Sequence, residues 1–215
     1  RISIRDIESS WGEAQCMSGP KIKFSYDVQS KDENGKPVVL KKERDLFPTS
    51  LKYVVSAETQ ILHRSIYDVT VYSASVHTMG SFIIPDDMRA QTSASIIISL
   101  KDLRGIEGEA SIDFNGREYG FVAADEGQAI RTDVLLPGKE YVSGTELKFD
   151  MEFKLKGSEA LQFKPVGNMT EIEMTSDCKT PSFVGSFLPA ERSVDENGFS
   201  ARWIVSQINR GAPES

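Results

Sequence analysis

A chain of 215 residues in which 39% are hydrophobic and 27% are charged has the composition of a globular domain with a buried core. Its apolar stretches are all much shorter than the roughly 20 residues that a membrane-spanning helix needs. The 32 acidic residues outnumber the 25 basic ones, and the net charge of -7 opposes binding to nucleic-acid phosphates. The composition predicts one large domain and excludes nucleic acid as a partner.

The first residues are predicted to form a short N-terminal helix. Ile4, Ile7 and Trp11 recur at spacings of three and four, which places them on one helical face. No Ser, Thr, Asp or Asn stands before Arg1 to cap the first turn. We therefore expect this helix to continue a helix that begins upstream.

After Ser18-Gly19-Pro20 the pattern changes to the two-residue period of β-strands, and Asn34-Gly35 supplies a hairpin turn. Turns recur at short intervals and no helical crossover joins the strands, which favours antiparallel pairing. The predicted fold is all-β, a large antiparallel β-sandwich of roughly a dozen strands with the short N-terminal helix. Strands are expected at 22–29, 38–44, 50–62, 67–78, 93–100, 108–114, 118–123, 130–136, 146–155, 161–165, 170–175 and 199–205.

The two cysteines, Cys16 and Cys178, lie far apart in the sequence, without a CxxC spacing or a neighbouring histidine. This pattern excludes the usual zinc and redox motifs. Two alternatives remain open. The thiols could pair as a disulfide in an oxidising compartment, or both could be buried and inert.

Candidate catalytic groups are sparse. His63 and His77 fall on neighbouring predicted strands, but no third ligand stands at a metal-binding spacing. The carboxylates of two predicted hairpins are explained more readily as outward-facing strand residues than as an acid–base pair; they are Glu107, Glu109, Asp113, Glu171 and Glu173. We therefore expect no catalytic residue, no metal, no cofactor and no enzymatic activity.

Several short motifs together, in their order and spacing, resemble the CreD family of bacterial inner-membrane proteins over most of the chain. They include Phe47-Pro48-x-x-Leu51, Asp102-Leu103-Arg104-Gly105-Ile106 and Leu161-x-Phe163-x-Pro165-x-Gly167. Ser65 and Cys178 depart from the family pattern, which usually has glycine at the first position and tryptophan near the second. The motif residues to which we assign structural roles are Trp11, Gln15, Gly19, Pro20, Arg64, Tyr67, Tyr72, Arg104, Gly105, Pro181, Ser182, Phe183, Leu188, Pro189, Arg192, Gly198, Phe199 and Trp203.

The resemblance implies a membrane helix, then this domain on the periplasmic side of the inner membrane, then further membrane helices. Residues 1–18 would be the juxtamembrane helix and residues 19–215 a single extracytoplasmic domain, with both ends facing one membrane surface. Because Cys16 lies beside a family motif and Cys178 replaces a family residue, the resemblance also strengthens the disulfide hypothesis.

The implied function is a non-catalytic domain of a polytopic inner-membrane protein linked to envelope integrity or envelope signalling, with an envelope protein or cell-wall material as its partner. The alternative is a sandwich that binds or processes carbohydrate, which needs aromatic platforms beside carboxylates. The aromatic candidates for such a platform are Trp11, Trp203, Tyr119 and Tyr141. In the closing stretch, 181–189 is expected to be an ordered connector that leads to the last strand.

Overall fold

The computed structural model describes residues 11–64, 67–86, 93–124, 127–135 and 143–210. Within these ranges the protein is built from strands and one 3-10 turn, Leu103–Gly105. The strands are β1 Gln15–Lys31, β2 Pro37–Leu46, β3 Ser50–Arg64, β4 Tyr67–Ile83, β5 Ser93–Leu100, β6 Ile106–Glu107, β7 Ser111–Phe114, β8 Arg117–Gly120, β9 Val122–Ala123, β10 Ala129–Val134, β11 Glu146–Ser158, β12 Leu161–Lys164, β13 Met169–Ser176, β14 Glu191–Asp195 and β15 Gly198–Ser206.

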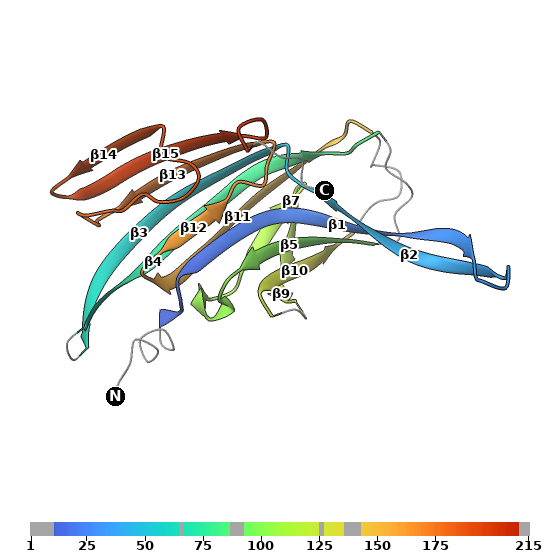
Figure 1. The fold of residues 1–215 in the computed structure, drawn as a ribbon, viewed down its shortest axis with the longest axis horizontal. Coiled ribbons are helices and arrows are strands. Elements are labelled where there is room, and N and C mark those ends of the chain that lie inside the picture. Colours follow the sequence, from blue (N-terminus) through green and yellow to red (C-terminus); the bar gives the residue numbers. More distant parts are fainter. Residues whose placement is uncertain (1–10, 65–66, 87–92, 125–126, 136–142, 211–215) are drawn as a thin grey trace.

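The strands form two sheets, which Figure 1 shows as two curved layers. The small sheet has the order β12-β1-β5-β10-β9, and β2 pairs with β1. The large sheet has the order β14-β15-β13-β3-β4-β11-β7-β8, and β6 pairs with β11. The all-β class predicted from the sequence is therefore confirmed, and the strands are arranged in two sheets.

One hydrophobic core lies between the two sheets. Phe24 and Ile96 of the small sheet and Tyr53 and Phe82 of the large sheet are almost fully buried within it. The ring of Tyr53 lies 4.9 Å from that of Phe163 in β12, so side chains of the two sheets touch directly. Burial of these apolar side chains is the main term that holds the layers together.

The periodicity of β11 illustrates why the sequence folds this way. Its five apolar residues are buried and its intervening charged residues are exposed, as the strict alternation predicts. The buried residues are Leu147, Phe149, Met151, Phe153 and Leu155. This strand lies in the middle of the large sheet between β4 and β7, so its apolar face meets the core along its whole length.

The expected N-terminal helix is wrong over its last part. Residues 1–10 lie outside the described residues and Trp11 is helical, but the helix does not continue beyond it, and strand β1 begins at Gln15. From there the chain runs through the cis peptide bond between Gly19 and Pro20 without leaving the sheet. Gln15 and Met17 are buried whereas Cys16 and Ser18 are half-buried, so the two-residue period of β1 starts before the proline.

The expectation of purely antiparallel pairing is also wrong at two places. β12 runs parallel to β1, and β13 runs parallel to β3. More than a hundred residues separate the two members of each pair, and the intervening chain forms other strands of both sheets. A helical crossover is therefore not required, and the absence of helices did not restrict these pairings.

Three further differences concern strand bounds. The expected strand 108–114 is interrupted at Gly108, whose φ is +76°, and continues only as β7. The expected strand 118–123 divides at Phe121, where the chain passes from β8 in the large sheet to β9 in the small one. The edge strand β14 was not expected, because all five of its residues are exposed and carry no alternation.

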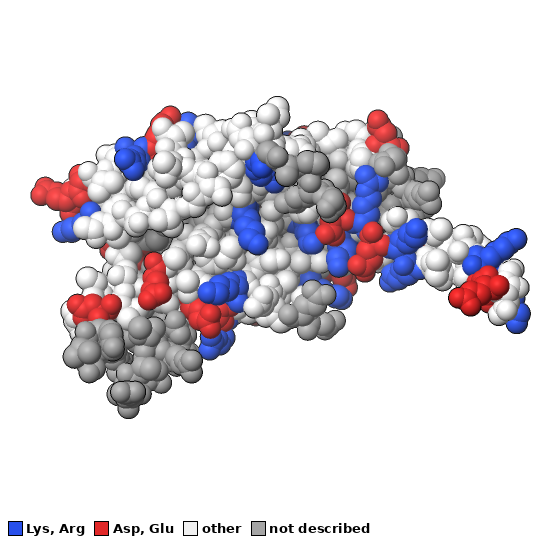
Figure 2. Space-filling view, viewed as in Figure 1, with Lys and Arg blue, Asp and Glu red and all other residues white. Residues whose placement is uncertain are grey.

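The β1–β2 hairpin extends beyond the body of the protein, as Figures 1 and 2 show. Ile22 and Phe24 at its base are buried, whereas Asp27, Gln29 and the residues of the turn are exposed. Acidic and basic side chains are interspersed over the face shown in Figure 2. The described part of the chain offers no helix that could serve as a membrane span.

Candidate functional site

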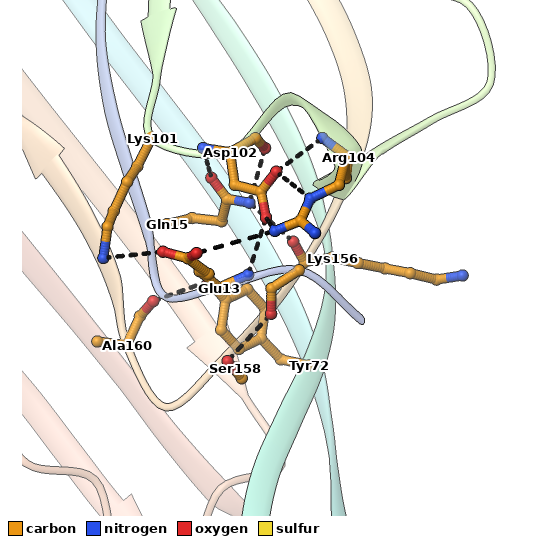
Figure 3. Close-up of polar contacts among 10 residues, drawn as sticks. Glu13, Gln15, Tyr72, Lys101, Asp102, Arg104, Lys156, Ser158 and Ala160 are labelled. Atoms are coloured by element: carbon orange, nitrogen blue, oxygen red, sulfur yellow. Dashed lines mark hydrogen bonds and ion pairs between the residues drawn. The ribbon is translucent and has the colours of Figure 1, made fainter. Parts of the chain in front are cut away.

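The chain is fixed near its described start by a polar cluster, here called the Gln15 hub, which consists of the buried Gln15, Asp102 and Ser158 and the more exposed Glu13 and Arg104 (Figure 3). The Gln15 side chain is 1% exposed. Its amide nitrogen donates to the carbonyls of Asp102, at 2.9 Å, and Lys156, at 3.3 Å, and its oxygen accepts the N–H of Asp102 at 3.3 Å. All three bonds reach backbone groups, so one side chain joins β1 to the 3-10 turn and to β11.

Asp102 organises the second part of the hub. Its carboxylate caps the 3-10 turn by accepting the N–H of Arg104 at 3.0 Å, and it also accepts the Glu13 N–H at 3.1 Å. The Arg104 guanidinium donates to both carboxylate oxygens, at 2.9 and 2.8 Å. These hydrogen bonds, those from the Arg104 side chain above all, hold the pKa of Asp102 below its ordinary value.

The third part of the hub ties the incoming chain to the end of β11. The Ser158 hydroxyl donates to the Gly12 carbonyl at 3.0 Å, and the Gln15 N–H donates to the Ala160 carbonyl at 2.9 Å. The buried Tyr72 hydroxyl donates to the same Ala160 carbonyl at 2.8 Å. Burial raises the Tyr72 pKa, so the hydroxyl stays protonated and keeps donating.

Two glycines make the close approach of these elements possible. A Cβ at Gly105 would overlap the Gln15 amide and the Lys156 carbonyl. A Cβ at Gly157 would overlap the hydroxyl of Tyr72. Both positions therefore require glycine for reasons of space, and this explains why they accompany Gln15 and Tyr72 in the sequence motifs.

The chemistry of the hub is that of a structural junction. The polar side-chain atoms of Gln15 and Asp102 are engaged with backbone groups or with Arg104. Among the described residues no group of three or more His, Cys, Asp or Glu side chains is arranged to hold a metal. A nucleophile or a general base needs a free, accessible group, which these buried acceptors do not provide.

The described end of the chain has a second junction, formed by Arg210. Its guanidinium donates to the carbonyls of Pro165, at 2.5 Å, and Gly167, at 3.0 Å, just after β12. The N–H of Gln207 donates to the Asn168 carbonyl at 2.7 Å. Arg210 and the Gln15 hub thus hold the chain at the two ends of the same short strand, β12.

Comparison with known proteins identifies the family of the chain. Residues 1–215 match the family described as inner membrane protein CreD. The chain belongs to the CreD family. It is also similar to the inner membrane protein CreD of Escherichia coli (strain K12), with 37% identity over 115 residues. That match covers 52% of this chain and 25% of the relative, so the chain spans only a part of the length of that protein.

The CreD motifs that the sequence separates widely are brought together by the fold. Trp11 packs against Val69 and Val71, and the Lys156 ammonium lies 5.4 Å from the centre of its ring. The carbonyl of Gly19, at the cis bond to Pro20, accepts the hydroxyl of the buried Tyr53. These contacts continue the Gln15 hub on both sides, toward β4 and toward the core.

The closing CreD motif forms the predicted connector and last strand. Phe183 packs edge-on against Phe199, with ring centres 5.4 Å apart, and against Trp203, at 5.7 Å. The Arg192 guanidinium lies 5.9 Å from the Phe183 ring centre. Gly198 has a φ of +136°, and a Cβ there would overlap the Ser176 carbonyl. The connector therefore packs against the last strand, β15.

The remaining motif residues make fewer described contacts. Arg64 and Tyr67 are opposite each other in the β3–β4 register, and nothing is described of their side chains. Pro181 and Pro189 are half-buried, whereas Ser182 and Leu188 are exposed in the connector. None of these residues joins the Gln15 hub in the described contacts.

The two cysteines are free thiols in the structure. Cys16 lies in β1 of the small sheet, and Cys178 follows β13 of the large sheet. Both are half-buried. The proposed disulfide is therefore not formed here, and titration of thiols in the unreduced, denatured protein is the measurement that decides whether it ever forms.

The histidines do not come together. His77 is opposite Val54 in the β3–β4 register, and nine residues of strand, about 30 Å, separate Val54 from His63. His63 contacts Asp68 at 2.5 Å, and His77 contacts Asp150 at 3.0 Å. Each imidazole is thus an exposed partner of one carboxylate.

The candidate carboxylates are engaged at the surface. Glu107 pairs with Lys156, whose hydrogen bond is the main cause of its lowered pKa. Glu171 accepts the Arg202 Nε–H at 2.8 Å, which likewise lowers its pKa. Glu173 pairs with Lys52 at 2.8 Å. Asp113 accepts the Gly116 N–H in the turn, and Glu109 is exposed.

Sequence reasoning missed the central role of Asp102 and the contributions of Glu13 and Ser158. Asp102 two residues before Arg104 is a recognisable capping signal for a short helical turn. A glutamine in the apolar phase of a strand, as at Gln15, signals a buried amide that needs partners. Ser158 gives no such signal in the sequence. It lies in the large sheet, whereas Gln15 lies in the small one, so only the fold reveals its contact with Gly12.

Proposed function

We propose that this chain is a non-catalytic domain on the periplasmic side of the inner membrane, which contributes to envelope integrity or envelope signalling as part of a larger polytopic protein. Membership of the CreD family supports the membrane location. The two sheets are arranged in layers as in a β-sandwich, a fold that does not by itself specify a function.

The observation that carries the proposal is the placement of the two junctions. Gln15 is opposite Leu161 in the parallel register of β1 and β12, and Arg210 binds the carbonyl of Pro165. The four residues of β12 span about 13 Å. The two junctions therefore lie at opposite ends of one short strand, an arrangement that is compatible with a domain inserted between membrane segments.

The described groups favour a non-catalytic role. The histidines and the candidate acids take part in separate surface pairs, and the buried polar atoms of the Gln15 hub serve the backbone. For the carbohydrate alternative, three candidate aromatics pack into the fold: Trp11 on Val69, and Trp203 and Tyr119 on the main core. Tyr141 lies outside the described residues. The alternative has therefore no support from an exposed aromatic platform in the described part.

The location is tested by cysteine labelling in the full-length protein. With Cys16 and Cys178 replaced by serine, Asn34→Cys introduces one thiol in the exposed turn of the β1–β2 hairpin. We expect a membrane-impermeant maleimide to label this thiol in intact cells as fully as in lysed cells. Labelling that requires lysis of the inner membrane places the domain in the cytoplasm and contradicts the proposal.

The envelope role is tested by complementation of a deletion strain under envelope stress. The wild-type gene and the Gln29→Leu control, which changes an exposed residue of β1, are expected to restore growth. Gln15→Leu, which damages the hub, is expected to restore it less at equal expression. Binding of peptidoglycan fragments measured by calorimetry, together with loss on Trp203→Ala, would favour the carbohydrate alternative instead.

A further inference from the structure

A cavity of about 490 Å³ opens beside the Arg210 junction. Its walls come from β1, from the end of β5, from the turn after β12 and from the connector before β14. The CreD motif around Pro165 and the motif around Phe187 both contribute to it. The Gln15 hub and its hydrogen bonds lie outside this cavity.

The lining of the cavity is basic although the chain as a whole is acidic. Lys21, Lys164 and Arg210 line it, and none of its lining residues is Asp or Glu. Lys21 pairs with Asp45, which leaves Lys164 and Arg210 without an acidic partner among the described residues. Ser18, Ser99 and Ser186 add hydroxyl donors. In a chain of net charge -7, this concentration of donors selects an anion.

Arg210 has unused hydrogen-bonding capacity. Its two terminal nitrogens donate to the carbonyls of Pro165 and Gly167, which fixes the plane of the guanidinium. The Nε–H is buried and has no partner among the described residues. A fixed guanidinium without an acidic partner among the described residues, in a cavity that a lysine also lines, attracts phosphate oxygens through its charge.

Exposed apolar side chains stand next to the cavity along the chain. Leu188 follows the lining residue Phe187 and is 69% exposed, and Ile208 lies two residues before Arg210 and is 90% exposed. Val184 of the same connector is 75% exposed. Apolar side chains beside cations are typical of surfaces that enter the interface of an anionic membrane.

We propose that this cavity binds the phosphate headgroup of an anionic phospholipid, while Leu188 and Ile208 enter the interfacial region of the bilayer. The inference rests on the proposed position of the domain beside the membrane, because only there is the lipid within reach. Cations and hydroxyls would hold the phosphate, and the membrane would cover apolar surface that is otherwise in contact with water.

Co-sedimentation of the 215-residue chain with lipid vesicles tests the proposal. We expect binding to vesicles of phosphatidylglycerol and phosphatidylcholine in equal amounts, and little binding to phosphatidylcholine alone. The double variant Lys21→Gln/Lys164→Gln should weaken binding roughly thirtyfold, since each basic residue near an anionic surface contributes on the order of 1 kcal/mol. An unchanged urea midpoint of this variant shows that the fold is retained.

The matched control is Lys41→Gln/Lys42→Gln, which removes the same charge from exposed positions of the projecting hairpin. Its effect should be about twofold at most, because attraction to the surface falls off within a Debye length. Equal losses of affinity in the two double variants would show that binding is nonspecific electrostatic attraction and would overturn the proposal.

Leu188→Ser should also weaken vesicle binding. Val122→Ser, which changes an apolar residue that is 63% exposed and does not line the cavity, should not.

Calorimetry with inorganic phosphate separates a lipid from a soluble anion. If phosphate binds with the same dependence on Lys21 and Lys164 while anionic vesicles do not bind, the site serves a soluble anion and the lipid assignment is wrong. The vesicle experiment uses the isolated chain and is independent of membrane sidedness. It can therefore fail while the cysteine labelling succeeds, and the reverse is also possible.

Discussion

The two junctions that hold the described ends of the chain differ in how completely their polar groups are paired. At the Gln15 hub, the side-chain amide of Gln15 is hydrogen-bonded to backbone groups, and the carboxylate of Asp102 is hydrogen-bonded to backbone N–H groups and to the Arg104 side chain. At Arg210 the buried Nε–H has no hydrogen-bond partner among the described residues, and the residue lines a cavity together with two lysines. A fully paired buried network fixes a structure, whereas cations next to open space can attract an anion.

The largest expected effect is the loss of stability on Gln15→Leu. Leucine has a similar size but leaves the N–H and C=O of Asp102 and the carbonyl of Lys156 without their partner. We expect the free energy of unfolding to fall by roughly 3 kcal/mol, measured by urea denaturation. The same substitution at the exposed Gln29 should change it by less than about 0.5 kcal/mol. Equal effects at the two positions would mean that the hub is not a distinct structural element.

Steric requirements at the hub come next. Gly157→Ala places a methyl group against the Tyr72 hydroxyl and should cost roughly 2 kcal/mol of unfolding free energy. Gly120→Ala is the control, because no atom lies within 4 Å of the position of its added Cβ. It should be neutral, or stabilising by a few tenths of a kcal/mol, because alanine lowers the conformational entropy of the unfolded chain. A harmless Gly157→Ala would show that the elements of the hub do not approach as closely as described.

Arg210→Met should be milder than Gln15→Leu. It removes the two hydrogen bonds to Pro165 and Gly167, but it also removes the buried N–H that lacks a partner. We expect a loss of about 1 kcal/mol in urea denaturation. Arg131→Met, which removes only a surface pair with Asp133, should lie within about 0.5 kcal/mol of wild type. A loss as large as that of Gln15→Leu would erase the contrast between the junctions.

The smallest effect concerns pH. The pKa of Asp102 is lowered in the folded state, so its contribution to stability is present above the unfolded-state pKa, about 4, and is lost as the pH falls through the lower folded-state value. Asp102→Asn should therefore be less stable than wild type by about 1 kcal/mol at pH 7. This difference should shrink below pH 4 in denaturation measured across pH. A difference that is constant down to pH 2 would show that the charge of Asp102 does not stabilise the fold.

Local periodicity allowed much of the strand content to be predicted, since alternation is a property of consecutive residues. β5 and the start of β11 fall where the pattern places them. β14 was missed because an exposed edge strand has no apolar face to alternate. The parallel pairings of β12 and β13 depend on contacts between distant segments, which no local pattern encodes.

The site was predictable only as separate motifs. The family resemblance indicated that Gln15, Tyr72 and Gly105 matter, but it did not indicate that they touch. The side-chain hydrogen bonds of Gln15 and Ser158 in the hub reach residues 87 and 146 positions away in the sequence. The cavity at Arg210 was not predicted at all, because its lining residues come from six segments that are far apart in the sequence and meet only in the folded chain.

The position of β12 between the two junctions has a mechanical consequence. β1 runs parallel to β12 from Gln15, and Arg210 is attached beyond the other end of β12. A force that pulls the two chain ends apart would therefore act along these strands and strain several of their hydrogen bonds simultaneously, in shear. Bonds loaded in this way resist force far better than bonds that open one after another. The bonds of β1 and β12 would therefore oppose extension between the two described ends of the chain.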